Sequence, residues 1–209
     1  MILVTGATGH VGKHIVRGMV EAGEKVRALS RNPGSRPWPP GVEVLPGDLT
    51  QPGTLAAALG GVDSMYLFPV FGAVPGAVEA ARQAGVKHVV MLSSQAIEYS
   101  SGDPHLACEE AVTASGLSWT FVRTGALMVN DLHWAGQFAG EGVVRGAYGS
   151  SPLAPIDERD IAAVVVSSLL TPRSGTVHTV TGRAPYTYAE WLAHHEADFR
   201  PAGQAAAGH

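Results

Sequence analysis

The chain has 209 residues, of which 45% are hydrophobic and 26 are glycine, and its formal net charge at pH 7 is −4. A chain of this length buries a sizeable core in one large domain or two small ones, and we expect one. No apolar run approaches the ~18 residues of a membrane span, and no basic stripe favours direct nucleic-acid binding. The composition therefore predicts a soluble globular protein that binds neither a membrane nor a nucleic acid.

The start of the chain and its cysteine content indicate a compartment. Residue 1 leads directly into an apolar run, without the basic start and cleavage site of a signal peptide. The single cysteine, Cys108, permits no internal disulfide, and Glu109 and Glu110 beside it disfavour a thiolate. We expect a cytoplasmic protein with an unreactive Cys108.

In chain order the first element is the stretch 1–12, MILVTGATGHVG. Its residues 2–4 are apolar and suit a strand buried on both faces of a parallel sheet. The apolar residues of 11–20 recur at helical spacing. Between strand and helix the glycines follow the pattern GxxGxxG, at Gly6, Gly9 and Gly12.

This glycine turn suits a dinucleotide. Glycine permits positive φ, a close approach of the backbone to a pyrophosphate, and tight packing of the helix on its strand. Amide groups at the helix start then face the phosphates. The alternative is a glycine-rich turn that binds no ligand, but the place of this turn directly after a buried strand favours a binding site.

The rest of the chain alternates strands and helices. Strands are expected at 25–29, 42–45, 64–68, 88–92, 119–122 and 177–180, with a further short one within 142–149. Helices are expected at 50–59, 75–84, 104–115, 130–139, 159–170 and 188–199. Asp103 and Pro104 form a strong helix start. The βαβ alternation predicts an α/β fold with a doubly wound parallel sheet, whose ligands lie outside the carboxyl ends of the strands.

We expect one domain over residues 1–199, with a core at 1–123, a looser part at 124–199 and a disordered tail at 200–209. The segments TGATGHVG, VRALSRNP, GDL at 47–49, HLACEEAVTASGLSWTFVR and APIDERDIA resemble the atypical short-chain dehydrogenase/reductases. Within them the chain is similar to the NmrA-like group, and most of all to its bacterial NAD(P)H:quinone oxidoreductase type. The resemblance covers 1 to about 191 and implies an NAD(P)-binding Rossmann fold. It also implies a small, truncated substrate-side region, because members usually continue beyond the TYAE segment at 187–190.

The resemblance implies where the cofactor binds. The pyrophosphate would lie on the turn formed by Gly6, Ala7, Thr8, Gly9, His10 and Val11. Ser30 and Arg31, after the second strand, would meet the adenosine ribose. An NAD site prefers an acid at this place and an arginine suits a 2′-phosphate, so the residues favour NADP(H) over NAD(H). The alternative is that Arg31 is simply a solvated surface residue.

Further cofactor contacts are implied by position. Asp48 and Leu49 would meet the adenine, and the end of the fourth strand would run along the ribose with Leu67, Phe68 and Pro69, although Phe68 suits the core equally well. Ser93 and Ser94, at the end of the fifth strand, are placed to line the nicotinamide pocket. Short polar residues there also cap turns, which is the competing interpretation.

The catalytic residues are less clear from the sequence. Short-chain dehydrogenases commonly use Tyr-x-x-x-Lys, but the lysines at 13, 25 and 87 do not follow any tyrosine at that spacing. His105 and Glu109 share a helix face and match a His-x-x-x-Glu pattern of the quinone-oxidoreductase-like members. His105 would touch the nicotinamide or substrate and Glu109 would orient it, or the two would form a helix-surface hydrogen bond.

Two features are interpreted as structural. His194, His195, Glu196 and Asp198 are adjacent on a helix and point in different directions, so we expect a solvated helix end and no metal site. Asp157 and Asp160 look like carboxylates at a helix start, where the helix dipole favours them.

Two functional classes remain open. The first is an enzyme that moves hydride from NADPH to a small-molecule acceptor, a quinone or similar carbonyl, which does not need a tyrosine because the cofactor carries the hydride. The second is a redox sensor that binds NAD(P) and acts through a protein partner, as some NmrA-like members do. The absent Tyr-Lys pair favours the sensor and the His105/Glu109 match favours the enzyme, which we prefer. A homodimer is compatible with either class.

Overall fold

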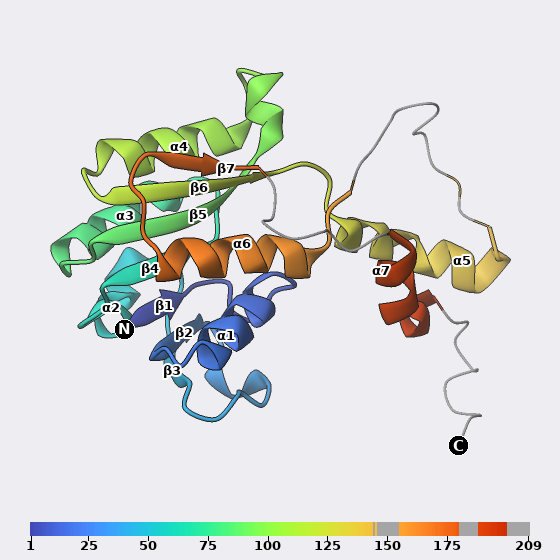
Figure 1. Cartoon of the computed structure of the whole chain (residues 1–209), viewed down its shortest axis with the longest axis horizontal. Coiled ribbons are helices and arrows are strands. Elements are labelled where there is room, and N and C mark those ends of the chain that lie inside the picture. Colours follow the sequence, from blue (N-terminus) through green and yellow to red (C-terminus); the bar gives the residue numbers. More distant parts are fainter. Residues whose placement is uncertain (144, 146–154, 180–187, 200–209) are drawn as a thin grey trace.

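The computed structural model describes residues 1–143, 145, 155–179 and 188–199 (Figure 1). In these residues seven parallel strands form one sheet in the order β3-β2-β1-β4-β5-β6-β7. The strands are β1 (Ile2–Val4), β2 (Val26–Ser30), β3 (Glu43–Pro46), β4 (Ser64–Leu67), β5 (His88–Ser94), β6 (Ser118–Thr124) and β7 (Thr176–His178). The predicted doubly wound parallel sheet is confirmed.

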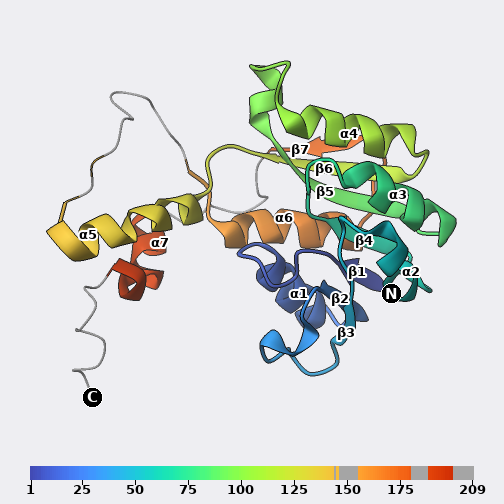
Figure 2. The ribbon, with the colours of Figure 1, turned by 180° about the vertical axis from the view of Figure 1, so that it is seen from behind.

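Helices cover both faces of the sheet, as Figures 1 and 2 show from opposite sides. The α-helices are α1 (Gly12–Glu21), α2 (Ala56–Leu59), α3 (Val74–Gln83), α4 (Pro104–Ala114), α5 (Ala135–Glu141), α6 (Glu158–Leu170) and α7 (Tyr188–His194). Helices α1 and α6 pack together on one face, and α3 packs with α4 and α2 on the other. In both views α5 and α7 lie beyond the carboxyl ends of the strands.

The central strands are largely apolar because the sheet is covered on both faces. Alternate residues of β1 enter different cores: Ile2 and Val4 pack with α1 and α6, whereas Leu3 packs with the helices of the other face. Helix α1 turns Ile15, Val16 and Met19 inward, as their helical spacing predicts, and all three are buried. This packing holds the turn between β1 and α1 against the sheet.

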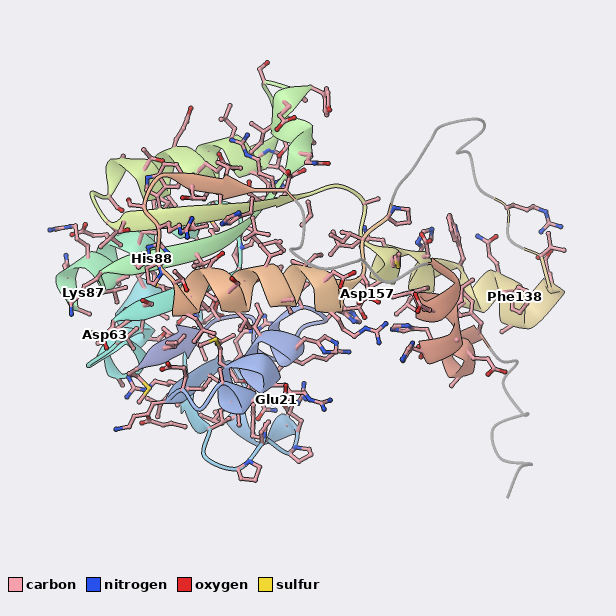
Figure 3. All side chains as sticks on the ribbon, viewed as in Figure 1. Glu21, Asp63, Lys87, His88, Phe138 and Asp157 are labelled. Carbon is pink, nitrogen blue, oxygen red and sulfur yellow. The ribbon has the colours of Figure 1, made fainter. Side chains whose placement is uncertain are left out.

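The amino ends of the strands are tied by polar contacts that Figure 3 places far from α5 and α7. The Asp63 carboxylate pairs with the terminal ammonium of Met1 and with Lys87 Nζ, each at 3.1 Å. His88 is buried, and its Nδ1 lies 2.9 Å from Ser118 Oγ. These residues fasten the end of the sheet opposite to the one at which ligands are expected.

Three predicted helices are shorter than the patterns suggested. Residues 50–59 form a 3₁₀ turn at 52–54 followed by α2. The Thr54 hydroxyl stabilises this turn, since it donates to Gln51 O and accepts the amide of Asp48. Residues 128–134 and 196–199 are also 3₁₀ rather than α-helical. Strand β2 begins and ends one residue later than predicted, so that it includes Ser30. Most of 142–149, Val180 and the tail at 200–209 lie outside the described residues.

Across the parts of the chain that the structure describes, each helix is too short or too polar to cross a membrane.

Candidate functional site

The strand order reverses between β1 and β4, and this is where a doubly wound sheet opens a crevice. Thr5 lies at this point and links the ends of the two strands. This buried residue donates its amide to Tyr66 O at 3.1 Å, and its hydroxyl accepts the Phe68 amide at 2.8 Å. The carboxyl ends of β1 and β4 are therefore fixed side by side.

The three glycines of the following turn serve different needs. Gly6 has φ +57°, and a Cβ there would lie 2.9 Å from Phe68 Cβ. At Gly12 a Cβ would lie 2.1 Å from Gly6 O, so the first turn of α1 rests directly on the backbone of the loop. Gly9 is exposed and its amide donates to Gly6 O at 2.9 Å. Gly6 and Gly12 thus stand where a side chain would collide with a neighbour, and the turn presents its backbone to the pocket, as the spacing predicted.

A pocket of about 500 Å³ opens above this turn. It brings together segments that follow five different strands. Of the residues predicted to hold the cofactor, those that line it are Gly6, Thr8, Gly9, His10, Val11, Ser30, Arg31, Asp48, Leu49 and Phe68. Most of the predicted cofactor residues are therefore neighbours in space.

Ser30, Arg31 and Asp48 form one end of the pocket. The Ser30 hydroxyl accepts the Asn32 amide at 3.1 Å, which is the capping role of a turn residue. Asp48 accepts hydrogen bonds from the amide and hydroxyl of Thr50, at 2.9 and 2.8 Å. These bonds, with a smaller contribution from the charge of Arg31, lower the pKa of the Asp48 carboxyl. Arg31 is exposed and free to turn toward a ligand at this rim.

Five predicted cofactor residues lie outside the residues that line the pocket. Ala7, Leu67 and Pro69 are buried, and Leu67 belongs to the core below α2 and α3. The Ser93 hydroxyl donates to Glu109 at 2.6 Å on the α4 side of the sheet, whereas its neighbour Leu92 lines the pocket. Successive strand residues face opposite sides, which explains why Ser93 turns away. Ser94 caps a 3₁₀ turn by accepting the amide of residue 96.

The expected pairing of His105 with Glu109 is wrong. Glu109 is buried against β6, where Arg123 binds both of its carboxylate oxygens, at 2.9 and 2.6 Å. His105 Nδ1 lies 2.7 Å from the carboxylate of the helix cap, Asp103, and its ring meets Phe71 edge-on at 4.9 Å. The i,i+4 spacing correctly placed His105 and Glu109 on one side of α4. However, a buried carboxylate such as Glu109 needs a cation, and this cation is Arg123 of β6, the strand beneath the helix.

The pKa directions agree with these pairings. The hydrogen bonds from the His105 amide and ring lower the pKa of the Asp103 carboxyl. The hydrogen bond to Glu109 raises the pKa of the Arg123 guanidinium. Asp103 and Arg123 are therefore charged throughout the neutral range, and each holds its partner in a fixed orientation.

The sequence did not reveal the wall that lies after β6. Leu127, Val129 and Asn130 also line the pocket. They belong to an irregular stretch that is placed by tertiary contacts, such as the bond from the Met128 amide to Ile156 O at 2.9 Å. The apolar character of Leu127 and Val129 was visible in the sequence, but no local pattern linked this stretch to the glycine turn.

The fold and this pocket define a dinucleotide-binding protein of the doubly wound α/β class. The chain matches, over residues 6–172, a family model described as NAD(P)H-binding. It therefore belongs to this NAD(P)H-binding family.

Named relatives narrow the class. The chain is 39% identical over 208 residues to the (4-alkanoyl-5-oxo-2,5-dihydrofuran-3-yl)methyl phosphate reductase of Streptomyces griseus, which covers 92% of this chain and 72% of that protein. It is 37% identical over 206 residues to the NAD(P)H azoreductase of Xenophilus azovorans, with 91% and 71% covered. The crystal structure of an NADPH-dependent quinone oxidoreductase of Escherichia coli complexed with NADPH has a TM-score of 0.75 at 25% identity, covering 96% of this chain and 76% of that one. The predicted family resemblance is confirmed, and the chain is an NAD(P)H-dependent oxidoreductase.

Proposed function

We propose that the protein reduces a quinone or a similar carbonyl acceptor with NADPH. The observation that carries this proposal is the pocket itself, which joins the glycine turn, the Ser30–Arg31 rim and the wall after β6 in one space. The relatives named azoreductase and quinone oxidoreductase support an acceptor of this kind.

The residues present fit a dinucleotide. Gly9 lines the pocket and has no side chain, so the backbone of the turn is open to a pyrophosphate. Arg31 provides a cation beside the end of β2, where the ribose of the adenosine half lies in such folds. With the adenosine at β2 and β3, the nicotinamide lies on the side of β5 and β6. We propose that Arg31 selects NADPH by pairing with its 2′-phosphate.

Reduction of a quinone by NADPH needs little general acid–base catalysis from the protein. A bound reduced nicotinamide supplies the hydride, and a proton from solvent completes the hydroquinone. Tyr66 is fully buried, and burial raises the pKa of its phenol, so it is not available as a general acid. His105 lies outside the residues that line the pocket. We propose that it orients the acceptor, since Asp103 fixes its Nδ1 and about a quarter of its side chain is exposed.

The state of the cysteine supports a reducing compartment. Cys108 is buried, and this burial, followed by the charges of Asp103 and Glu109, raises the pKa of its thiol. A thiol kept protonated is unreactive, as predicted. We propose a cytoplasmic location because the chain has a single cysteine and so no internal disulfide, which suits a reducing compartment.

The test is consumption of NADPH by the purified protein with a panel of quinones. Deuterium at the transferred position of NADPH should slow turnover if hydride transfer limits the rate. His105→Ala should lower kcat by about tenfold, which is less than the roughly 10²- to 10⁴-fold of a positioned acid–base group because His105 only orients the acceptor, and it should leave the Kd for NADPH within about twofold. Saturable NADPH binding without turnover on any quinone or carbonyl would overturn the proposal and favour a sensor. Equal turnover in His105→Ala would make His105 a surface residue.

A further inference from the structure

The wall after β6 is held from behind by a tryptophan of α7. Trp191 is 0% exposed and forms a buried apolar cluster with Met128 and Val129. This cluster is separate from the two that fill the faces of the sheet. Val129 belongs to the cluster and also lines the pocket, so the cluster that contains the indole reaches the pocket lining.

A buried carboxylate fixes the indole in place. Trp191 Nε1 donates to Glu158 Oε2 at 3.1 Å, and His195 Nε2 lies 3.4 Å from Glu158 Oε1. The rings of Trp191 and His195 are stacked, with centroids 4.2 Å apart. Glu158 is 1% exposed and is the first residue of α6, where the helix dipole favours a carboxylate. Trp191 and His195 therefore both contact the Glu158 carboxylate, and these two contacts fix the position of α7 relative to α6.

The start of α6 and the wall are also joined directly. Ile156 pairs with Leu127 as a parallel bridge, and the amides of Met128 and Ile156 bond to Ile156 O and Ala126 O at 2.9 and 2.8 Å. The start of α6 therefore holds the wall through the backbone on one side and through Trp191 on the other. Figure 3 shows Asp157, at the start of α6, on the side of the molecule that carries α7.

We infer that Trp191 is a positioning residue for the nicotinamide end of the pocket, that it acts through Val129, and that Glu158 holds its indole. The inference rests on the proposed function in one respect, that NADPH binds with its nicotinamide toward β6. A residue that only stabilised the fold would affect all parts of the cofactor equally. Trp191 should affect the nicotinamide and the acceptor and leave the adenosine half unchanged.

The experiment compares two probes on the full chain. NADPH carries the nicotinamide, whereas ADP-ribose lacks it and reports the glycine turn and the adenosine end alone. Trp191→Ala should raise the Kd for NADPH by about tenfold and lower kcat by at least as much, because displacements of about 1 Å at a reacting centre cost up to about 10²-fold. The Kd for ADP-ribose should stay within about twofold.

Two milder variants and a control complete the design. Trp191→Phe removes the N–H and keeps a ring, and Glu158→Gln keeps the shape of the acceptor and removes its charge. Each should raise the NADPH Kd by about threefold with ADP-ribose unchanged, which keeps the test valid if Trp191→Ala does not fold. The control is Trp119→Phe at the other end of β6, where the indole stacks on Phe121 at 4.2 Å. It should change neither Kd.

The outcomes separate this inference from the proposed function. Loss of affinity for both probes in parallel, or unchanged affinity for NADPH in folded Trp191 variants, would refute the positioning role and leave the reductase proposal intact. A wild-type protein that does not bind NADPH would refute both.

Discussion

Replacing Gly12 with alanine should damage both the fold and the cofactor site. The added Cβ would lie 2.1 Å from Gly6 O, 2.8 Å from Gly6 C and 2.9 Å from Ala7 Cα. Ordinary contact begins near 3.4 Å, so the helix start and the loop must separate by about 1 Å, and backbone atoms offer no side chain that could rotate aside. Overpacking of this kind costs about 1–3 kcal/mol. For a chain of this size that lowers the melting temperature by about 2 to 12 °C.

The same displacement moves the amides of the glycine turn. Because phosphate binding depends on amides held at hydrogen-bond distance, we expect Gly12→Ala to raise the Kd for NADPH by at least tenfold at a temperature where the variant is folded. Thermal denaturation followed by circular dichroism and titration of NADPH fluorescence measure the two effects.

Two other glycines isolate the causes. Gly9→Leu should abolish binding at a smaller cost in stability than Gly12→Ala, because Gly9 is exposed and lines the pocket and its Cβ would lie 3.2 Å from Gly6 O rather than 2.1 Å. Gly53→Ala is the matched control, since a Cβ there would meet nothing within 4 Å, and it should leave both quantities unchanged. A Gly12→Ala protein with wild-type melting temperature and NADPH affinity would refute the idea that α1 rests on the Gly6 carbonyl.

Three more predictions concern single side chains. The wild-type protein should prefer NADPH over NADH by about tenfold to seventyfold in Kd, because an exposed charge-assisted pair with the 2′-phosphate is worth about 1.5 to 2.5 kcal/mol after solvent screening. Arg31→Asp should reverse this preference. Equal wild-type Kd values for the two cofactors would contradict the prediction. Tyr66→Phe should stabilise the protein by about 1 kcal/mol in denaturant titrations, because the Tyr66 hydroxyl is buried without a hydrogen-bond partner among the described residues; a loss of stability would show that the hydroxyl has one. Asp157→Asn should be less stable than wild type at neutral pH and approach it in acid. Burial alone would raise the pKa of Asp157, but the hydrogen bonds from Arg159 outweigh it and lower the pKa below 3.8, so this stabilisation is present above that pH and lost as the pH falls through the folded value. A stability difference that stays constant from neutral pH to pH 3 would contradict it.

The parts of the site that the sequence predicted are those set by neighbouring residues. The strand, glycine turn and helix of 1–21 follow one another directly, so apolar spacing and the glycines were enough to place them. The ends of β2 and β3 were found in the same way, because ligands in such sheets meet the carboxyl ends of the strands. Ser30, Arg31, Asp48 and Leu49 line the pocket accordingly.

The parts that were missed depend on contacts between distant elements. Glu109 shares a helix face with His105, yet its partner is Arg123 on a strand that the helix covers. Ser93 follows Leu92, and strand alternation alone would have separated the two, but only the structure shows which of them faces the pocket. The wall at Val129 has no local signature, because its place is set by α6 and α7.

The two ends of the pocket are therefore held by different kinds of constraint. The glycine turn depends on backbone geometry, in which one added methyl group at Gly12 collides with the Gly6 carbonyl. The wall after β6 depends on packing, in which Trp191 and Val129 belong to a small apolar cluster of their own. Packed apolar clusters accept substitutions of similar volume at modest cost, whereas a backbone cradle does not. We therefore expect sequence change at the wall after β6 to affect the nicotinamide and the acceptor and to leave binding at the glycine turn unchanged. Two relatives at 39% and 37% identity with this chain are named for different reductase reactions, which agrees with that separation.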